Sequence, residues 1–342
     1  TTLLMTIATT GFLFMDEFSL VAIILMVLGG LGFSYTAYNF ATPSFPDYPK
    51  FSVWNNAYVV TTNEQGPGTS PAYFIDRADV LAGAATVDIQ RLTLPGAGGG
   101  PGFQVDTPVD WSGLTAPTPD ANPMILSLSD DAWGSSAVDQ VDIYSFEIDF
   151  DNPANTVTTV QSITTTPFDT NPCSAAGPGF ACMPQMGGAG LDGIPETIMH
   201  QAHYRNFGSH ESMVFNFITD VTAGQNLSGI RWVELRRGIG QTEWSLYQEG
   251  TFAPDDGLDR FMGGIAMDGS GNIALAYNVS SPNSFVGVRF TGRRASDPLG
   301  EMTVMEFNAV EGTNAINSFG RFGDYAHMSI DPVDDRTFWY TT

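Results

Sequence analysis

Arginine is scarce in this sequence, and most of the arginines lie in its second half, beside aromatic residues or carboxylates. A guanidinium group holds a planar anion through two parallel hydrogen bonds, so arginines that converge with an acid and a phenol would form a pocket for an anionic ligand. The candidate residues for such an axial pocket are Arg231, Arg260, Arg293, Arg321, Asp324 and Tyr325. The commoner role of an arginine at a strand end is to stack on an aromatic ring and form an ion pair, and Arg231 beside Trp232 and Glu234 fits that role.

Carboxylates in polar turns are the second set of residues that could do chemistry. Oxygen ligands from loops are what calcium prefers, and the candidates are Asp255, Asp256, Asp268 and Asp334. Adjacent strand residues point to opposite faces, which makes Asp255 and Asp256 a poor acid and base pair. His210 and Glu211 lack the second histidine of a zinc-binding helix. We therefore expect no required cofactor, with calcium as the one ion that the sequence suggests.

The elements that must position these residues are short apolar segments closed by Gly, Asn or Asp turns, recurring roughly every ten residues between Met199 and Tyr340. Two hairpins, at 266–275 and 329–338, share an apolar strand, an Asp, a polar tip and a second apolar strand. This rhythm predicts an all-β fold with little helix. The expected form is a β-propeller of short antiparallel blades, incomplete or part of a longer chain.

The chain divides into an apolar segment at 1–40, interpreted as strands of a first blade, and a propeller domain at 41–342. That domain carries a long Gly/Pro-rich loop around 170–196. Phe18 to Phe33 is apolar but short for a membrane helix, and no Lys or Arg precedes Lys50 to orient it, so membrane insertion is not expected. The alternative, a hydrophobic helix that packs into a surface filament, remains open.

Composition excludes some partners and suggests a compartment. The 37 acidic residues outnumber 13 basic ones, giving a net charge of -24, which argues against a nucleic-acid surface because phosphate contacts need clustered Lys and Arg. An acidic surface fits salty water or divalent cations. The only cysteines, Cys173 and Cys182, lie in one Pro/Gly-rich segment and predict a disulfide in an extracellular or cell-surface protein.

Several long blocks resemble a family of large secreted bacterial proteins, mostly of unknown function, whose shared domain is similar to a β-propeller. The blocks include PSFPDYPKFSVW, YRNFGSHESMVFNF, GIRWVELR, RFMGGIAMDGSGNIALAYNVSS and RFGDYAHMSIDPVDDRTFWYT, and they occur in the same order from Pro43 to Thr341. The chain departs from the family pattern at Leu20 to Phe33, which is apolar where the family is polar, and at Arg336, where Cys is common. The resemblance implies a secreted propeller.

These observations predict a secreted or cell-surface propeller that acts as a binding or structural module without chemistry of its own, with a cell-surface glycan or protein as partner. One alternative is a glycoside hydrolase of sialidase-like architecture, which needs at least three arginines converging with a Tyr and a carboxylate in one axial pocket. The other is a self-assembling subunit of an extracellular filament or surface layer, in which the apolar segment is the packing element.

Overall fold

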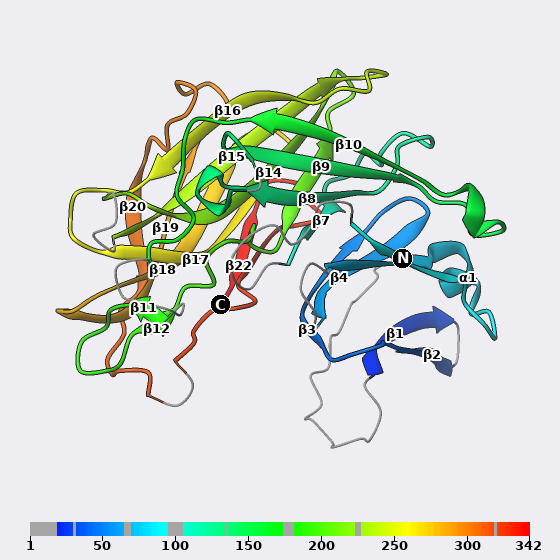
Figure 1. The fold of residues 1–342 in the computed structure, drawn as a ribbon, viewed down its shortest axis with the longest axis horizontal. Helices are drawn as coiled ribbons and strands as arrows, with labels where there is room; N and C mark the ends of the chain where they lie inside the picture. Colours follow the sequence, from blue (N-terminus) through cyan, green and yellow to red (C-terminus); the bar gives the residue numbers. More distant parts are fainter. Residues whose placement is uncertain are drawn as a thin grey trace.

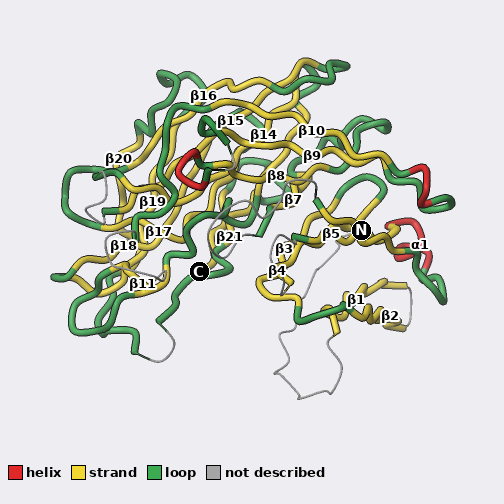
Figure 2. Tube along the Cα trace, viewed as in Figure 1, coloured by secondary structure: helices red, strands yellow, loops and turns green. Residues whose placement is uncertain are grey.

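The computed structural model describes residues 19–29, 32–64, 70–94, 105–134, 136–173, 181–222, 227–317 and 320–342, and the side chains from residue 38 onward. Strands dominate the described chain (Figure 2). Its helices are short, namely α1 (Arg77–Ala82) and the 3-10 turns η1 (Asp131–Trp133) and η2 (Pro153–Asn155). None of these helices is long and apolar enough to cross a membrane.

Several sheets fill the body of the molecule (Figure 1), and five strands, each the first strand of a blade, follow one another around a common axis through their pairings and contacts. They are β3 (Pro46–Val53), β7 (Thr107–Trp111), β13 (Ala202–Asn206), β17 (Asp259–Met267) and β21 (His327–Ile330). Strand β7 contacts β3 and pairs in parallel with β13, while β17 contacts both β13 and β21. The ring returns to β3 because the Tyr48 hydroxyl donates a 2.6 Å hydrogen bond to the backbone carbonyl of Asp324, shortly before β21. The predicted all-β propeller is confirmed.

Each of the first four blades continues outward from the axis as an antiparallel meander. The first blade adds β4 (Ala57–Glu64), β5 (Pro71–Asp76) and β6 (Ile89–Thr93). The second adds β8 (Met124–Ser129), β9 (Gln140–Glu147) and β10 (Val157–Thr164). The third adds β14 (His210–Asp220), β15 (Ser228–Gly238) and β16 (Ser245–Phe252). The fourth adds β18 (Ile273–Ser281), β19 (Ser284–Arg293) and β20 (Val304–Val310). In the fifth, β21 pairs with β22 (Phe338–Thr341).

The apolar start of the chain forms a hairpin that is not hydrogen-bonded into the sheets of these blades, although Tyr38 packs against the first blade. Strands β1 (Ser19–Gly29) and β2 (Gly32–Ala41) pair in antiparallel fashion as a two-stranded sheet of their own. Residues 1–18 lie outside the described chain. The filament-packing role predicted for Phe18 to Phe33 likewise concerns side chains outside the described ones.

Apolar side chains fill the spaces between successive blades, which is how a propeller buries both faces of its sheets. Phe74 of the first blade packs in one cluster with Phe146 of the second. The second and third blades share a larger cluster, the third and fourth share another, and Met328 joins the fourth and fifth. Burial between blades therefore fixes the positions of the innermost strands and of the residues where they begin.

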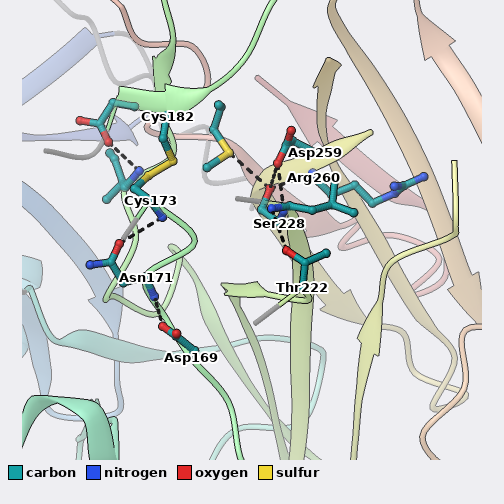
Figure 3. Close-up of a disulfide and its surroundings, with 12 residues drawn as sticks. Asp169, Asn171, Cys173, Cys182, Thr222, Ser228, Asp259 and Arg260 are labelled. Carbon is teal, nitrogen blue, oxygen red and sulfur yellow. Dashed lines mark hydrogen bonds between the residues drawn. A yellow bond between two sulfur atoms is a disulfide. The ribbon is translucent and has the colours of Figure 1, made fainter. Parts of the chain in front are cut away.

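The Gly/Pro-rich loop predicted around 170–196 contains a small hairpin, β11 (Ala181–Met183) and β12 (Leu191–Asp192). The predicted disulfide between Cys173 and Cys182 is confirmed and joins the start of the loop to β11 (Figure 3). Cys173 is buried in the same apolar cluster as Leu191 and Met199. The bridge thus fastens the loop to the end of the axis where the innermost strands begin.

Candidate functional site

The axial end at which the innermost strands begin, called the entry end below, holds one guanidinium between two carboxylates. Nη1 of Arg321 lies 3.1 Å from Oδ2 of Asp324, and Nη2 lies 3.3 Å from Oδ2 of Asp192. Asp192 ends β12 and Asp324 precedes β21, so remote segments supply the pair. Burial, and to a lesser degree Asp192, raise the pKa of Asp324, although Arg321 acts in the opposite direction.

Two tyrosines lie beside these charges. Their rings, those of Tyr48 and Tyr325, have centroids 5.1 Å apart. Tyr48 is buried, whereas Tyr325 is 55% exposed, so an aromatic surface is open to solvent next to the carboxylates. Burial of the hydroxyl region raises the pKa of Tyr325 to about 12, which keeps the phenol neutral at physiological pH. A neutral aromatic face beside two acids suits a ligand with an apolar face and many hydroxyl groups, such as a sugar ring.

Lys50, the only lysine of the chain, is buried under the entry end with no carboxylate bonded to it. Its ammonium donates to the carbonyls of Val105 and Ile198 at 3.0 and 2.6 Å, and to the hydroxyls of Thr107 and Thr197 at 2.9 and 2.6 Å. Burial lowers the pKa of Lys50 to about 7, and Asp106 partly opposes this shift. The side chain therefore ties β3 to β7 and to the segment before β13.

Three of the four histidines of the sequence also lie here: His200, His203 and His327. Burial lowers the pKa of all three, that of His203 to about 3, so the imidazoles are neutral at pH 7. Nε2 of His203 donates to the carbonyl of Met328 at 2.9 Å, and Nε2 of His327 lies 2.7 Å from Oε1 of Gln201. Neutral rings held this way are rigid parts of the floor of the site.

Backbone conformations that ordinary residues rarely adopt gather at the same end. Tyr48, Ile194, Glu196 and Met262 have φ values of 48°, 46°, 70° and 51°. Tyr48 and Met262 lie at irregularities in the pairing of β3 with β4 and of β17 with β18. Such conformations cost free energy and concentrate at functional sites, so their gathering supports a site at the entry end.

The structure separates the six residues predicted for one axial pocket. Arg321, Asp324 and Tyr325 lie together at the entry end. Arg231 of β15 instead pairs with Glu249 of the neighbouring β16 at 2.5 Å, inside the third blade. This is the ion-pair role that an arginine at a strand end commonly has.

Arg260 and Arg293 also act within and between blades. Arg260 is fully buried and pairs with Asp256 at 2.8 Å and with Glu306 of β20 at 3.0 Å. Arg293 donates to backbone carbonyls of the loop after β19, and its guanidinium lies 5.9 Å from the ring centre of Trp232 in the third blade. The convergence of three arginines that a sialidase-like pocket requires is not found among the described residues.

The four aspartates predicted to bind calcium do not lie together either. Asp256 binds Arg260, and Asp268 accepts backbone N–H groups within its own hairpin tip. Asp334 does the same in the 329–338 hairpin, and Asp255 lies in the loop before β17. Among the described residues, three other carboxylates come within ligand distance of one another, those of Asp130, Asp131 and Asp139.

Sequence reasoning missed several residues of the entry end, namely Lys50, Asp192, Glu196, His200, His203 and His327. The signals were weak but present. One lysine in an otherwise lysine-free chain lies within a strand, where a charged side chain needs a reason. Two histidines also stand three residues apart just before a predicted strand.

The opposite end of the axis has a cavity of about 200 Å³, lined among others by Leu114, Phe207, Arg205 and Asp335. Arg205 of β13 donates to the carbonyl of Met267 at 2.9 Å and to both carboxylate oxygens of Asp335. The guanidinium is thus already neutralised. The cavity therefore has one carboxylate for its arginine, whereas the entry end has two carboxylates for one arginine.

No protein-family model and no curated protein matches this chain. Two solved structures are similar to it. One is an α-L-arabinanase of Penicillium chrysogenum complexed with arabinobiose, with 9% identity and a TM-score of 0.46 over 95% of this chain and 80% of that one. The other is an endo-arabinase of Bacteroides thetaiotaomicron, with 13% identity and a TM-score of 0.35 over 84% of this chain and 95% of that one.

Both matched proteins are named as enzymes that act on arabinan, and one carries a carbohydrate ligand. The prediction of a module without chemistry of its own is corrected below to its enzyme alternative, a glycoside hydrolase, on the residues of the entry end. The likeness itself extends to the fold alone, so the residues of the entry end must carry any argument about a reaction.

Proposed function

We propose that this protein is a glycoside hydrolase whose reaction centre lies at the entry end. The observation that carries the proposal is the arrangement of Asp192 and Asp324 on either side of Arg321, next to the exposed ring of Tyr325. Most glycoside hydrolases use two carboxyl groups that flank the scissile bond. The carbohydrate in the α-L-arabinanase structure is consistent with a glycan as partner.

Separate acid and base roles need one carboxyl group that holds a proton beside one that is ionised. The raised pKa of Asp324 favours a carboxyl group that holds a proton for the leaving oxygen. Asp192 supplies the second carboxylate, to activate water or to attack the sugar carbon. Since both contact one guanidinium, their contacting oxygens are at most about 9 Å apart, which does not exceed the widest spacing that glycosidases use.

A neutral glycan is the substrate class that these residues favour. Only Arg321 among the described arginines lies at the entry end, and its two nitrogens are bound to carboxylates. An anionic sugar would have to compete with those carboxylates, which makes a sialidase-like substrate unfavourable. The ring of Tyr325 offers a stacking surface for a neutral sugar.

The same proposal places the protein outside the cell or at its surface. The support is the Cys173–Cys182 disulfide, because such bridges persist in oxidising compartments. An extracellular polysaccharide would be accessible to the enzyme in that compartment.

The test is reducing-sugar release from a panel of neutral and acidic polysaccharides. We expect hydrolysis of a neutral polymer, and a loss of kcat of about 100-fold or more in Asp324→Asn and Asp192→Asn. Tyr325→Ala should raise KM more than it lowers kcat. Asp120→Asn, an exposed aspartate away from the entry end, is the matched control and should keep full activity.

A panel without any hydrolysis would contradict the proposal. So would an active enzyme in which Asp324→Asn and Asp192→Asn both retain the full rate with an unchanged melting temperature. Preference for acidic sugars would overturn the assignment of a neutral substrate while leaving the reaction class in place.

A further inference from the structure

The fifth blade has an unpaired edge among the described residues. Each of the first four blades has four strands, whereas β21 pairs with β22 alone. The far edge of β22 therefore presents backbone N–H and C=O groups to any strand that can align with it. The outer half of this blade is open in the described chain.

The fourth blade has an apolar face where that outer half would lie. On the face towards the fifth blade, Ala266 of β17 and Ala276 of β18 pack in one cluster with Met328 of β21. Phe290 of β19 is opposite Ala276 in the register, and Phe307 of β20 is opposite Phe290, so both rings continue this face outward. The two rings are 41% and 43% exposed. The face is thus covered over its inner strands and open over its outer ones.

The open part of this face forms a contiguous apolar surface. The rings of Phe290 and Phe307 stack with centroids 5.4 Å apart and planes inclined by 20°. Met305 and Val310 of the same strand β20 are 71% and 58% exposed. Grouped apolar side chains on an exposed sheet mark a contact surface, so this one calls for an apolar partner.

The first blade presents the facing surface, and the end of β2 already packs on it. Phe74 lies in the cluster shared with the second blade. Because successive strand residues alternate between faces, Tyr73 and Ile75 point to the other side, which in a ring is the side of the fifth blade. Tyr38 and Phe40 of β2 belong to the same apolar cluster as Tyr73 and Ile75. The hairpin β1–β2 therefore adjoins the open half of the fifth blade.

The sequence and the connection of this hairpin fit the two missing strands. Every residue of β1 between Ser19 and Gly29 is apolar, the pattern of a strand that is covered on both faces. In each of the first four blades, the chain leaves the fourth strand for the first strand of the next blade. The chain likewise leaves β2 at Ala41 and begins β3 at Pro46. By this order β2 corresponds to a fourth strand and β1 to a third.

We propose that the hairpin β1–β2 completes the fifth blade, with β1 antiparallel to the free edge of β22. The hairpin then lies between Phe290 and Phe307 of the fourth blade and Tyr73 of the first. The two strands belong to separate sheets in the structure, so the proposal adds one pairing that continues the antiparallel meander of the other blades. Since Asp324 and Tyr325 directly precede β21, this closure would hold the blade that carries them at the entry end. It does not depend on the reaction proposed for them.

Hydrogen exchange of single backbone amides in the whole chain tests the pairing. The N–H of Asp331 donates to the carbonyl of Thr337 at 2.8 Å, at the end of the β21–β22 ladder. By antiparallel alternation, the N–H of Trp339 then points to β21, and those of Phe338 and Tyr340 point to the free edge. We expect the amides of Phe338 and Tyr340 to exchange about 100-fold or more slower than unpaired amides, with that of Trp339 as an internal control. In a chain of residues 42–342 only the two edge amides should lose this protection.

Melting temperatures test the packing of the hairpin on the fourth blade. Phe307→Ala should lower the melting temperature of the full chain by about 3 °C or more, because a covered ring is lost. Leu114→Ala, which alters a side chain that is 68% exposed at the opposite end of the axis, is the matched control and should shift it by less than about 1 °C. In the chain of residues 42–342, Phe307→Ala should lose most of its effect, since the two changes remove the same contact.

Three results would overturn the proposal. The first is exchange of the Phe338 and Tyr340 amides at the unpaired rate in the folded full chain. The second is protection that persists in the chain of residues 42–342, or that disappears when a dimer is diluted to the monomer, because another segment or a second copy would then occupy the edge. The third needs no shortened chain: equal shifts in melting temperature for Phe307→Ala and Leu114→Ala would show that the face is uncovered.

Discussion

Lys50 is a buried cation whose hydrogen-bond partners among the described residues are all neutral oxygens, and this makes stability depend on pH. Its pKa falls from 10.5 to about 7 on folding. Between those values the unfolded chain binds the proton more readily than the folded chain, so the free energy of unfolding rises with pH, by up to about 1.4 kcal/mol per pH unit. Lys50→Met removes this term. We expect wild type to gain stability relative to Lys50→Met as pH increases from 7 to 10.

Urea unfolding of both proteins at several pH values measures the difference directly. The chain contains no other lysine, so no second ammonium titrates in this range. The tyrosines and arginines are the same in both proteins, and their contributions to the pH dependence therefore cancel in the comparison. Lys50→Arg is a second control, since a guanidinium stays charged throughout this range and should destabilise the fold at every pH. Parallel pH curves for wild type and Lys50→Met would show that the ammonium does not titrate in this way.

The roles of single residues were harder to predict from the sequence than the strands and hairpins. The types of Arg231, Arg260 and Arg293 fitted ligand binding as well as the commoner structural role. Only their partners in the fold, Glu249 for Arg231, Glu306 for Arg260 and backbone carbonyls for Arg293, separate the two roles. The arginine that does lie at the entry end, Arg321, meets Asp192 from 129 positions earlier in the chain. Local sequence patterns do not reveal contacts between residues so far apart in the chain.

At the scale of elements the sequence was far more informative. The Asp-containing tip at 268–272 closes its hairpin as expected, with Asp268 accepting the N–H groups of Ser270 and Asn272. Local hydrogen bonds of this kind are set by neighbouring residues, which explains why the turn can be recognised from spacing alone. The irregularities at Tyr48 and Met262 could not be foreseen, because they depend on packing around the axis.

The disulfide supplies a prediction at the same scale. Cys173 and Cys182 are nine positions apart in the sequence, in a segment whose described part has one small hairpin. Restricting so short a loop in the unfolded chain is worth about 2–3 kcal/mol. Reduction should therefore lower the free energy of unfolding by that amount, measured by urea unfolding with and without reductant.

The paired Cys173→Ser and Cys182→Ser variant is the control for this measurement. It should match the reduced wild type and should not respond to reductant. An oxidised protein with the same stability as the variant would mean that the bridge adds nothing to the fold.

At the scale of the whole molecule, the propeller is a ring whose blades must be joined at both ends of the axis. Tyr48 and Lys50 make such contacts at the entry end, to the fifth blade and to the second. At the opposite end, Arg205 of the third blade reaches Met267 of the fourth and Asp335 of the fifth. The regular spacing of hairpins in the sequence predicted the blades. The contacts that join one blade to another depend on single residues that are far apart in the sequence.

Arg205 is accordingly the residue whose loss should weaken the ring most. It is 5% exposed, and Gly113 packs against its guanidinium so closely that a Cβ there would lie 2.6 Å from Nη2. Arg205→Met leaves the half-buried carboxylate of Asp335 without its partner, which should cost about 3–5 kcal/mol in the free energy of unfolding. Asp335→Asn leaves the more deeply buried guanidinium of Arg205 without its counter-charge and should cost a similar amount, although asparagine tolerates the positive φ of 55° found there.

The double variant Arg205→Met with Asp335→Asn decides whether the pair acts as a unit. Because the uncompensated charge is then gone, it should be more stable than Arg205→Met alone, and the two single effects should not add. Urea unfolding followed by far-ultraviolet circular dichroism and by tryptophan fluorescence gives both the free energies and a check that the blades unfold together. If the two single changes in the free energy of unfolding add up to that of the double variant, the ion pair contributes no stability. Apolar packing alone would then hold the third, fourth and fifth blades together.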